Sequence, residues 1–500
     1  MLSSWIWSLS VLAVGLQHLH GSHADEDVSH PETPPNQESQ PIINPTDTEP
    51  LFLTPLIDDC NYTEAREKSK IPSFLLANVT AHSGYITVNK TANSNLFFLL
   101  TEVEGNKTAP LLLWTQGGPG LSALFGLLLE NGPFAFDIYA NGSPNVHPRY
   151  NTLQKDMSVL YLDLPVGAGF SFTNDTVHGY PTKLEDIVLH VVEFLRQFLS
   201  VFSEYTNRDF YLAGESYGAR YSVAIASWML NYPQNVSLAL KGVIGGNGFL
   251  GPVLYVADSS EFLYQMSMLD NNGRTTFANK FVELRSLAES GNTTLKLYAL
   301  QQLFETIFAK QNATPTLFQN LTLYNDHASP LKTERPLFMI VCYLFLSMNT
   351  TKIMLHAGAD AHFQIYNEDL VKNFASDWLR DITDMNEHVL NKTNVLLYTG
   401  QIDALFPSVN QRTYFKRLNW TYRDQYKAAD RYPWKPYEKY YGFAGYMTTV
   451  ETFKEIVLLG MSHYGAVDKP DETYYLIREF VNNASNVKTP PKAPETTATS

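Results

Sequence analysis

The chain has 500 residues, of which 44% are hydrophobic and 17% are charged, so it can form a sizeable buried core. Its 50 acidic and 36 basic residues give a net charge of −14, which argues against nucleic acid as the main partner because phosphate binding needs a basic surface. With only two cysteines, Cys60 and Cys342, it is neither a disulfide-stapled scaffold nor a cysteine-rich zinc module.

Residues 1–24 have the features of a secretory signal peptide. An apolar run over residues 5–16 is too short for a comfortable membrane span, and small residues at Ser22 and Ala24 suit cleavage. Because the first residues carry no Lys or Arg, a membrane anchor or a buried N-terminal helix is the alternative. No later apolar stretch predicts a transmembrane helix or a membrane anchor. We expect a soluble product of the secretory pathway, lysosomal or extracellular.

The segments at both ends have too few apolar residues to fold. Residues 25–50 contain six prolines and seven acidic residues without a Lys or Arg. Residues 487–500 are rich in Pro and Thr and carry neither a retention signal nor a hydrophobic tail. We expect a disordered acidic leader and a disordered tail. The leader accounts for seven of the negative charges, so the body carries −14 + 7 = −7.

Asn-x-Ser/Thr sequons support the secretory prediction, since each is a surface acceptor for an N-linked glycan if the chain enters that pathway. The sequence contains fourteen, at Asn61, Asn78, Asn89, Asn106, Asn141, Asn174, Asn235, Asn292, Asn312, Asn320, Asn349, Asn391, Asn419 and Asn483.

Buried strands alternate with helices along the body of the chain. Apolar runs bounded by turn residues predict strands at 83–88, 96–102, 111–115, 159–163, 210–213, 241–244, 394–399 and 455–459. Residues 184–202 have apolar side chains at helical spacing. This alternation predicts the α/β class, with a mostly parallel central sheet flanked by helices.

Strand signals fade between residues 251 and 378, where helical patterns take over. We expect this block to be a helical cap insertion on the sheet. The core is then formed by two parts of the chain, residues 51–250 and 379–486.

A strand–turn–helix segment carries the motif G-x-S-x-G at Gly214–Gly218. The sharp turn needs glycine at its corners and leaves the Ser216 hydroxyl exposed above the sheet, as in a nucleophile elbow. The helix N-terminus that follows favours developing negative charge. An ordinary Gly-Ser turn is the alternative, and the flanking strand and helix make it less favoured.

A nucleophilic serine needs a base, and the base needs an orienting acid, which this fold class supplies in the order Ser, acid, His. After residue 388 the chain has one histidine, His463, in the loop after the strand at 455–459. Asp403 follows the strand at 394–399. Because active-site groups gather at strand ends in open α/β sheets, we predict a catalytic triad of Ser216, Asp403 and His463.

Several further motifs occur in a fixed order, at residues 51–57, 83–91, 114–120, 130–133, 163–171, 214–217 and 400–403 and around His463. Together they resemble the serine carboxypeptidases, the peptidase branch of the α/β-hydrolases, and in particular the vitellogenic-like carboxypeptidases. The resemblance covers residues 51–482 and implies an α/β-hydrolase fold.

The resemblance implies an enzyme that removes one residue from the C-terminal end of peptides or proteins, without a cofactor or metal ion. The free α-carboxylate of the substrate would be bound by Gln116, the Gly117 amide, Glu130 and Glu215. Carboxylates this close cannot all be ionised cheaply, so at least one of the two glutamates should have a raised pKa and act as a protonated donor. We therefore expect an acidic pH optimum. A homodimer is left open.

The resemblance also assigns the oxyanion hole to the backbone amides of Gly118 and Tyr217. The chain departs from the family pattern at several positions: Gly218, Ala219, Ala123, Ser462, Tyr464, Gly465, Ala466 and Lys469. None of these changes removes a catalytic atom. They bear on efficiency and residue preference, because loop packing positions His463.

Two other functions compete with this one. A non-peptidase α/β-hydrolase, such as an esterase or acyltransferase, would share the triad but would have no reason to surround it with Gln116, Glu130 and Glu215. A catalytically inactive binding or storage protein would be consistent with the altered His463 loop. For the cysteines, nothing places Cys60 and Cys342 together, so two unpaired buried thiols are favoured over a bridge.

Overall fold

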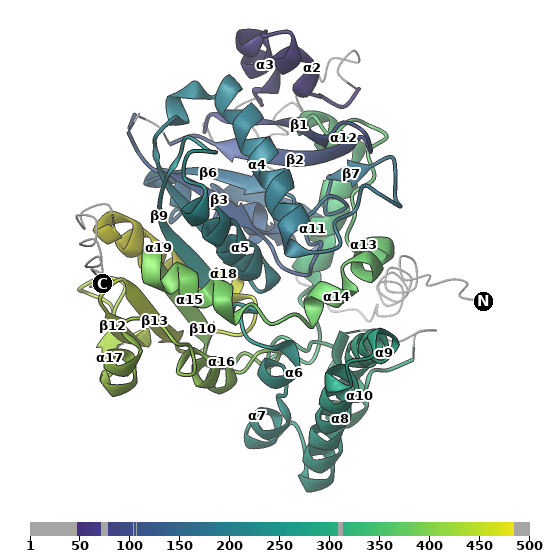
Figure 1. Cartoon of the computed structure of the whole chain (residues 1–500), viewed down its shortest axis with the longest axis vertical. Helices are drawn as coiled ribbons and strands as arrows, with labels where there is room; N and C mark the ends of the chain where they lie inside the picture. Colours follow the sequence, from purple (N-terminus) through teal and green to yellow (C-terminus); the bar gives the residue numbers. More distant parts are fainter. Residues whose placement is uncertain (1–47, 72–78, 104, 107, 309–313, 485–500) are drawn as a thin grey trace, which may run out of the picture.

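Figure 1 shows the computed structural model of the chain, which describes residues 48–71, 79–103, 105–106, 108–308 and 314–484. The predicted signal peptide, the leader as far as residue 47 and the predicted tail lie outside the described residues, as do the sequons at Asn78 and Asn312. The predicted core and insertion therefore contain almost all of what is described.

Within the described residues, eleven strands form one large sheet. Its order is β1 (Ala81–Asn89), β2 (Ser94–Thr101), β6 (Ser158–Leu162), β3 (Leu111–Thr115), β8 (Asp209–Glu215), β9 (Ala239–Gly246), β10 (Asn394–Gly400), β13 (Phe453–Leu458), β12 (Gly445–Val450) and β11 (Tyr432–Trp434), with β7 (Phe172–Thr173) beside β2. The central pairs from β6 to β13 are parallel, and antiparallel strands flank them on both sides. The expected mostly parallel sheet is confirmed, and all eight predicted strands are present.

Alternate residues of the central strands face opposite sides of the sheet, and both sides are buried. On β3, Leu111 and Leu113 belong to one hydrophobic core, while Leu112 and Trp114 belong to the other. Strands covered on both faces read as continuous apolar runs rather than as alternating ones. That is why these strands could be predicted from the sequence.

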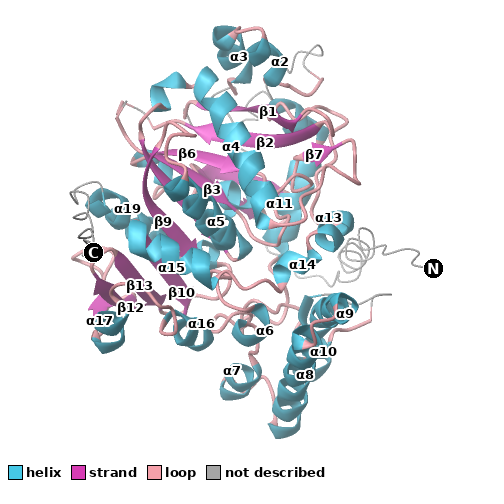
Figure 2. Ribbon diagram, viewed as in Figure 1, coloured by secondary structure: helices cyan, strands magenta, loops and turns pink. Residues whose placement is uncertain are grey.

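Helices cover both faces of the sheet (Figure 2). The first core is completed by α4 (Leu184–Val201), α5 (Tyr217–Asn231) and α15 (Thr383–Lys392). The second core is completed by the π-helical turn η3 (Gly126–Glu130), α11 (Leu337–Ser347) and α19 (Pro470–Ala484). The sheet is thus the middle layer of three.

Between β9 and β10 the described residues form helices without an intervening strand. Besides α11 and α15, these are α6 (Val253–Val256), α7 (Ser260–Gln265), α8 (Asn271–Glu289), α9 (Thr293–Leu303), the π-helical turn η6 (Phe304–Phe308), α10 (Leu317–Thr322), α12 (Asn349–Met354), α13 (Glu368–Asn373) and α14 (Ala375–Trp378). Helices α7 to α10 extend away from the sheet in Figure 1, whereas α11 packs against β4 (Phe134–Ile138) and β5 (Pro144–Pro148), a two-stranded sheet that the sequence did not reveal.

The other described helices are short: α2 (Thr54–Asp58), α3 (Tyr62–Ser69), α16 (Ser408–Phe415), α17 (Arg423–Ala428), α18 (Gly465–Asp468) and the 3-10 turns η4 (Leu153–Lys155) and η5 (Ser203–Tyr205). Across the part of the chain that the structure describes, no helix combines the length and apolarity that a bilayer crossing requires.

Two points differ from the sequence-based predictions. No strand was predicted beyond β13 at this edge of the sheet, yet β12 and β11 continue the sheet there. A proline at an edge, here Pro433, is compatible with a strand because its missing N–H is not needed there. Second, both cysteines are unpaired as expected, but Cys60 is exposed and only Cys342 is buried.

Candidate active site

Ser216 lies at the sharp turn between β8 and α5. Its backbone has φ 55° and ψ −121°, a region that a non-glycine residue occupies only when the surrounding structure enforces it. A Cβ atom on Gly214 would lie 2.3 Å from the Gly218 backbone, and one on Gly218 would lie 2.5 Å from the Thr115 carbonyl oxygen. Both glycines of the motif are therefore required by close backbone approach, and Ser216 is left half-buried between buried neighbours.

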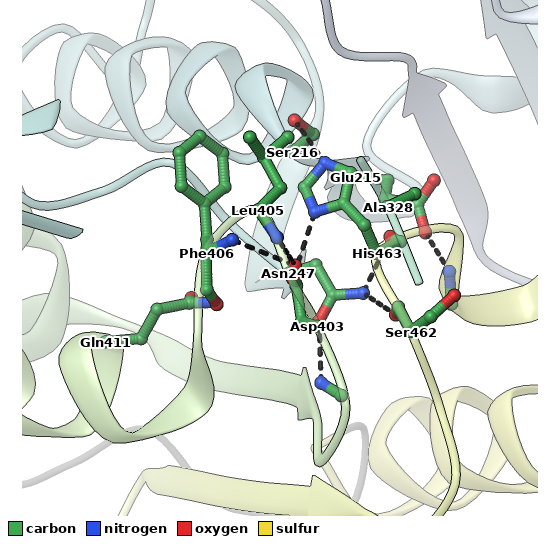
Figure 3. A network of polar contacts seen from close by, with 12 residues as sticks. Glu215, Ser216, Asn247, Ala328, Asp403, Leu405, Phe406, Gln411, Ser462 and His463 are labelled. Atoms are coloured by element: carbon green, nitrogen blue, oxygen red, sulfur yellow. Dashed lines mark hydrogen bonds and ion pairs between the residues drawn. The ribbon is translucent and has the colours of Figure 1, made fainter. Parts of the chain in front are cut away.

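Ser216, His463 and Asp403 lie in one hydrogen-bonded chain (Figure 3). The Nδ1 atom of His463 is 2.9 Å from Asp403 Oδ2, and its Nε2 atom is 3.1 Å from Ser216 Oγ. A carboxylate can only accept, so Nδ1 donates to Asp403 and Nε2 is left to accept from the serine hydroxyl. The structure thus brings together the three predicted triad residues, from the ends of β8, β10 and β13.

Asp403 is completely buried, and its orientation is fixed from both sides. Its Oδ1 atom accepts from the amides of Leu405 and Phe406, each at 2.9 Å, which leaves Oδ2 for the imidazole. The Phe406 ring packs edge-on against His463 with the ring centroids 5.3 Å apart. Asp403 therefore offers one oxygen to His463, and the Phe406 ring packs against the imidazole.

Opposing influences act on the imidazole of His463. Burial lowers its pKa, and the neighbouring Asp403 carboxylate, with smaller help from Glu215 and Asp326, outweighs burial and raises the pKa above its ordinary value. The charged form of the imidazole is thereby favoured, which is the form that accepting the serine proton would produce.

Glu130 and Glu215 are buried beside the triad and are bridged by Gln116. The Gln116 Nε2 atom donates to Glu215 Oε2 at 2.9 Å and to Glu130 Oε1 at 3.3 Å, while its Oε1 accepts from the Trp114 indole. The Gly465 amide donates to Glu215 Oε1 at 2.7 Å. The structure therefore places the three predicted carboxylate-binding side chains in one network, connected to the His463 loop through Gly465.

Burial raises the pKa of both glutamates, because a charged carboxylate loses its hydration there. For Glu215, whose pKa lies well above its ordinary value, the nearby charge of Glu130 adds to the shift. Because the charge of Glu130 opposes ionisation of Glu215, the pair is more stable with a proton on one of its two carboxyls than with both ionised. Within the described residues the buried Oε2 atom of Glu130 has no hydrogen-bond partner, so this carboxyl has an oxygen left for a ligand.

The predicted backbone donors lie next to the serine. A Cβ atom on Gly117 would be 2.7 Å from Ser216 Cβ and 3.0 Å from the Tyr217 nitrogen, so only glycine permits this approach. Gly118 has φ +112°, in the region that favours glycine. Tyr217 is the first residue of α5, where an amide has no acceptor within the helix.

Asn247 was not predicted, yet its side chain lies at the centre of Figure 3. Its Nδ2 atom donates to the carbonyl oxygens of Ser462 and His463, and its Oδ1 accepts from the Gly400 amide. It is completely buried with φ 43°. It follows an apolar strand, as Asp403 does, so the strand-end argument could have found it.

The His463 loop is also held by contacts that the sequence did not reveal. The Ser462 amide donates to Asp468 Oδ2 at 2.9 Å, and the Ser462 hydroxyl donates to the same oxygen. The other oxygen of Asp468 pairs with Lys332 Nζ at 2.9 Å. The Ala328 carbonyl accepts from the His463 amide at 3.2 Å. The loop before α11 is thereby joined to the loop of the base.

Asp163 fixes the segment that follows Gly118. Its Oδ1 atom accepts from the Ser122 hydroxyl at 2.6 Å and from the Ala123 amide at 2.8 Å, and its Oδ2 accepts from the Phe170 amide at 2.9 Å. Burial nevertheless raises the pKa of this carboxyl to about 7. Asp163 is the first residue of the motif at 163–171, and no role for it was predicted from the sequence.

Comparisons with known proteins agree on one family. The model of the serine carboxypeptidase family matches residues 72–483. The probable serine carboxypeptidase CPVL of Homo sapiens is 32% identical over 438 residues, covering 87% of this chain and 90% of that protein. The venom serine carboxypeptidase of Apis mellifera is 32% identical over 445 residues, covering 87% and 91%. The vitellogenic carboxypeptidase of Aedes aegypti is 30% identical over 437 residues, covering 87% and 90%.

The fold has a solved counterpart. The crystal structure of a prohormone-processing carboxypeptidase from Saccharomyces cerevisiae matches with a TM-score of 0.66 at 19% identity, covering 84% of this chain and 96% of that one. This likeness supports the α/β-hydrolase fold predicted from the strand–turn–helix motif. With a family match over most of its length and relatives at 30–32% identity, the chain belongs to the serine carboxypeptidase family of α/β-hydrolases.

Proposed function

We propose that the protein is a serine-type carboxypeptidase that hydrolyses the last peptide bond of peptides and proteins through a Ser216–Asp403–His463 triad. The observation that carries the proposal is the position of the buried Glu130–Glu215 pair beside that hydrogen-bonded triad. The triad alone would serve any acyl transfer. A pair of protonatable carboxyls next to it adds a reason for the substrate to carry a free carboxylate.

The reaction has two halves. The His463 Nε2 atom takes the proton of Ser216 Oγ as that oxygen bonds to the last peptide carbonyl, and the Gly118 and Tyr217 amides stabilise the oxyanion. The C–N bond then breaks, and the proton passes from His463 to the departing amino group. A water molecule next attacks the acyl carbon and gives a proton to His463. The C–Oγ bond then breaks, and His463 returns the proton to Ser216 Oγ.

Binding of the substrate C-terminus requires a proton on at least one of the two glutamates. The substrate α-carboxylate would meet a negatively charged site if both Glu130 and Glu215 were ionised. With at least one of them protonated, the carboxyl donates to the substrate, and the Gly117 amide adds a second donor. Gln116 holds the two glutamates together and has both N–H groups engaged in doing so.

An acidic pH optimum for peptide cleavage follows from two titrations with opposite effects. Deprotonation of the glutamate pair would lower the rate as pH rises, because the carboxylate donor is lost. Protonation of His463 would lower the rate as pH falls, since the base must be neutral to accept the serine proton. The raised pKa of the glutamate pair keeps the donor protonated on the acidic side of neutrality, and a protonated Glu215 no longer adds to the raised pKa of His463, so we expect the maximum there. A maximum above neutral pH would contradict this expectation.

Secretion with N-linked glycans, to a lysosome or the extracellular space, is proposed from the sequons. Of the twelve in the described residues, eleven asparagines are exposed and Asn89 is half-buried. Asparagine is mostly exposed in any folded protein, so this exposure makes the acceptors accessible, and the proposal rests on the number of sequons. Enzymatic deglycosylation of protein from a secreting eukaryotic host should therefore lower its apparent mass.

Hydrolysis of blocked dipeptides tests the proposed activity. The wild-type protein should cleave an N-blocked dipeptide acid and leave the matching C-terminal amide intact, whereas Ser216→Ala should cleave neither. A fluorophosphonate should label the wild-type protein at Ser216 and leave Ser216→Ala unlabelled. Equal turnover of the acid and the amide would support a non-peptidase hydrolase. A folded wild-type protein that takes no label would support an inactive binding protein.

A further inference from the structure

Arg335 is an exposed cation in the segment between α10 and α11. It takes part in none of the ion pairs or hydrogen bonds formed among the described residues. The buried carboxyl of Asp326 interacts electrostatically with Arg335 but forms no ion pair with it within the described residues, and its Oδ1 accepts from the Ala328 amide. The N–H groups of the Arg335 guanidinium are therefore left for a ligand or for water.

The segment before Arg335 is held in place against the triad. It closes on itself where the Thr333 carbonyl accepts from the Asn325 amide at 2.7 Å. Its Ala328 carbonyl accepts from the amide of His463, and Lys332 pairs with Asp468 of the same loop. Arg335 therefore follows a segment whose position is fixed relative to His463, and it lies two residues before α11.

Two tyrosines interact electrostatically with this guanidinium, and their hydroxyls have no hydrogen-bond partner among the described residues. Tyr464 and Tyr343 are both half-buried, and each interacts electrostatically with Arg335. The Phe125 ring packs against both, with centroid distances of 5.6 Å to Tyr464 and 6.2 Å to Tyr343. Neither hydroxyl oxygen is among the fully buried polar atoms that lack a partner, so both face accessible space.

Tyr464 stands at the place that the C-terminal residue of a substrate would occupy. Its neighbour on one side is His463, which would protonate the departing amino group. Its neighbour on the other side is Gly465, whose amide donates to Glu215 of the carboxylate site. Under the proposed function, a substrate residue whose amino group meets His463 and whose α-carboxylate meets the Glu130–Glu215 site would have its side chain near Tyr464.

We propose that Arg335, together with the hydroxyls of Tyr343 and Tyr464, binds the side-chain carboxylate of a C-terminal Glu or Asp and makes the enzyme selective for acidic C-terminal residues. The inference rests on the proposed carboxypeptidase function, since that function defines which substrate residue lies there. All three groups can donate, and a guanidinium matches a carboxylate with two parallel N–H bonds. Burial raises the pKa of both tyrosines, which keeps them protonated donors.

Two substrates of equal shape, one with a C-terminal Glu and one with a C-terminal Gln, isolate the effect of the side-chain charge on turnover. Benzyloxycarbonyl-Phe-Glu and benzyloxycarbonyl-Phe-Gln are compared at about pH 5.5, where the Glu side chain is ionised. The wild-type protein should prefer Glu by about tenfold in kcat/KM, as a charge-assisted hydrogen bond supplies. Arg335→Gln should bring the ratio close to one while cleavage of the Phe-Leu dipeptide changes less than about twofold. Arg196→Gln, an exposed substitution on α4, should keep the wild-type ratio.

Binding to the inactive protein separates this inference from the proposed activity. Calorimetry of Ser216→Ala should show tighter binding of the Glu than of the Gln dipeptide, and Ser216→Ala/Arg335→Gln should lose the difference. This result would support the inference even if the wild-type protein cleaved no dipeptide. Equal binding of Glu and Gln by Ser216→Ala would overturn it. An Arg335→Gln variant that is folded but loses all dipeptides equally would also overturn it, since Arg335 would then act on the α-carboxylate.

Discussion

The Nδ2 atom of Asn247 lies 2.7 Å from the carbonyl oxygen of His463, so the base is held from the end of β9, which β10 separates from β13 in the sheet. The same amide nitrogen reaches the Ser462 carbonyl at 2.8 Å, and the Oδ1 atom takes the Gly400 amide at 2.7 Å. One side chain therefore joins the ends of β9, β10 and β13, and it helps to hold the His463 imidazole in position beside Ser216.

Replacing Asn247 with Asp tests this role without a change in size. A carboxylate cannot donate to the two carbonyl oxygens, so the His463 loop should shift and kcat/KM should fall by about 100-fold, the loss that a displacement of about 1 Å can cause. Steady-state kinetics on a blocked dipeptide would measure it. Asn410→Asp is the matched control, because Asn410 also donates to two backbone carbonyls but lies away from the triad. Equal losses in both variants would contradict a specific role for Asn247.

The stability of the protein should fall as pH rises from about 5 to about 8. Glu130 and Glu215 have raised pKa values in the folded protein, so the folded state keeps protons that the unfolded chain has already released above its ordinary Glu pKa. In that window the folded state binds more protons, and the free energy of unfolding decreases with pH. Each tenfold difference in proton affinity between the folded and unfolded states contributes about 1.4 kcal/mol to this decrease.

Urea unfolding at a series of pH values would measure this slope, and Glu215→Gln should reduce it because one titrating carboxyl is gone, while Asp163, whose pKa is raised to about 7, continues to contribute. A free energy of unfolding that rises over the same range, in wild-type protein, would show that the pair is ionised when buried.

The same substitution should change the pH dependence of catalysis. A glutamine at position 215 can donate at every pH, so the loss of kcat/KM toward alkaline pH should become shallower than in wild-type protein. At the acidic optimum the cost should be about tenfold or less, because the carboxylate donor is replaced rather than removed. Rates on a blocked dipeptide between about pH 4 and pH 9 would show this. An unchanged alkaline limb would mean that a different group titrates there.

Asp163 should matter for stability more than for chemistry. Asp163→Ala leaves the Ser122 hydroxyl and two backbone amides without their acceptor in a buried site, so we expect a loss of about 3 kcal/mol. Ser122→Ala removes only one of the three donors and should cost less, about 1 kcal/mol. Chemical unfolding of the two variants would compare them. Equal losses would show that the hydroxyl, and not the carboxylate, holds this segment.

Much of the fold could be predicted from the sequence because the central strands are buried on both faces. Continuous apolar runs such as that of β3 mark such strands directly. Edge strands lack this signal: β11 is exposed at Tyr432 and contains Pro433, so neither composition nor periodicity identified it. The positions of Ser216, Asp403 and His463 could be predicted because each follows a recognisable strand.

Their supporting contacts could not be predicted, because they join residues that are far apart in the chain. Asn247 and His463 are 216 positions apart, and their contact depends on which strands become neighbours in the sheet. The unpaired guanidinium of Arg335 could not be predicted either, because an arginine between two helices has no distinctive sequence pattern. The predicted site was a set of residues, and the structure adds how they are connected.

The order in which the chain supplies the proposed site has a consequence for biosynthesis. The serine precedes its base by 247 positions, and β8, which ends just before the serine, is separated from β13 by the whole helical block and by β10. A growing chain therefore exposes Ser216 long before any imidazole can activate it. If the chain enters the secretory pathway during synthesis, as proposed, the triad is incomplete during translocation. The proposed activity then appears only when the final strands have joined the sheet.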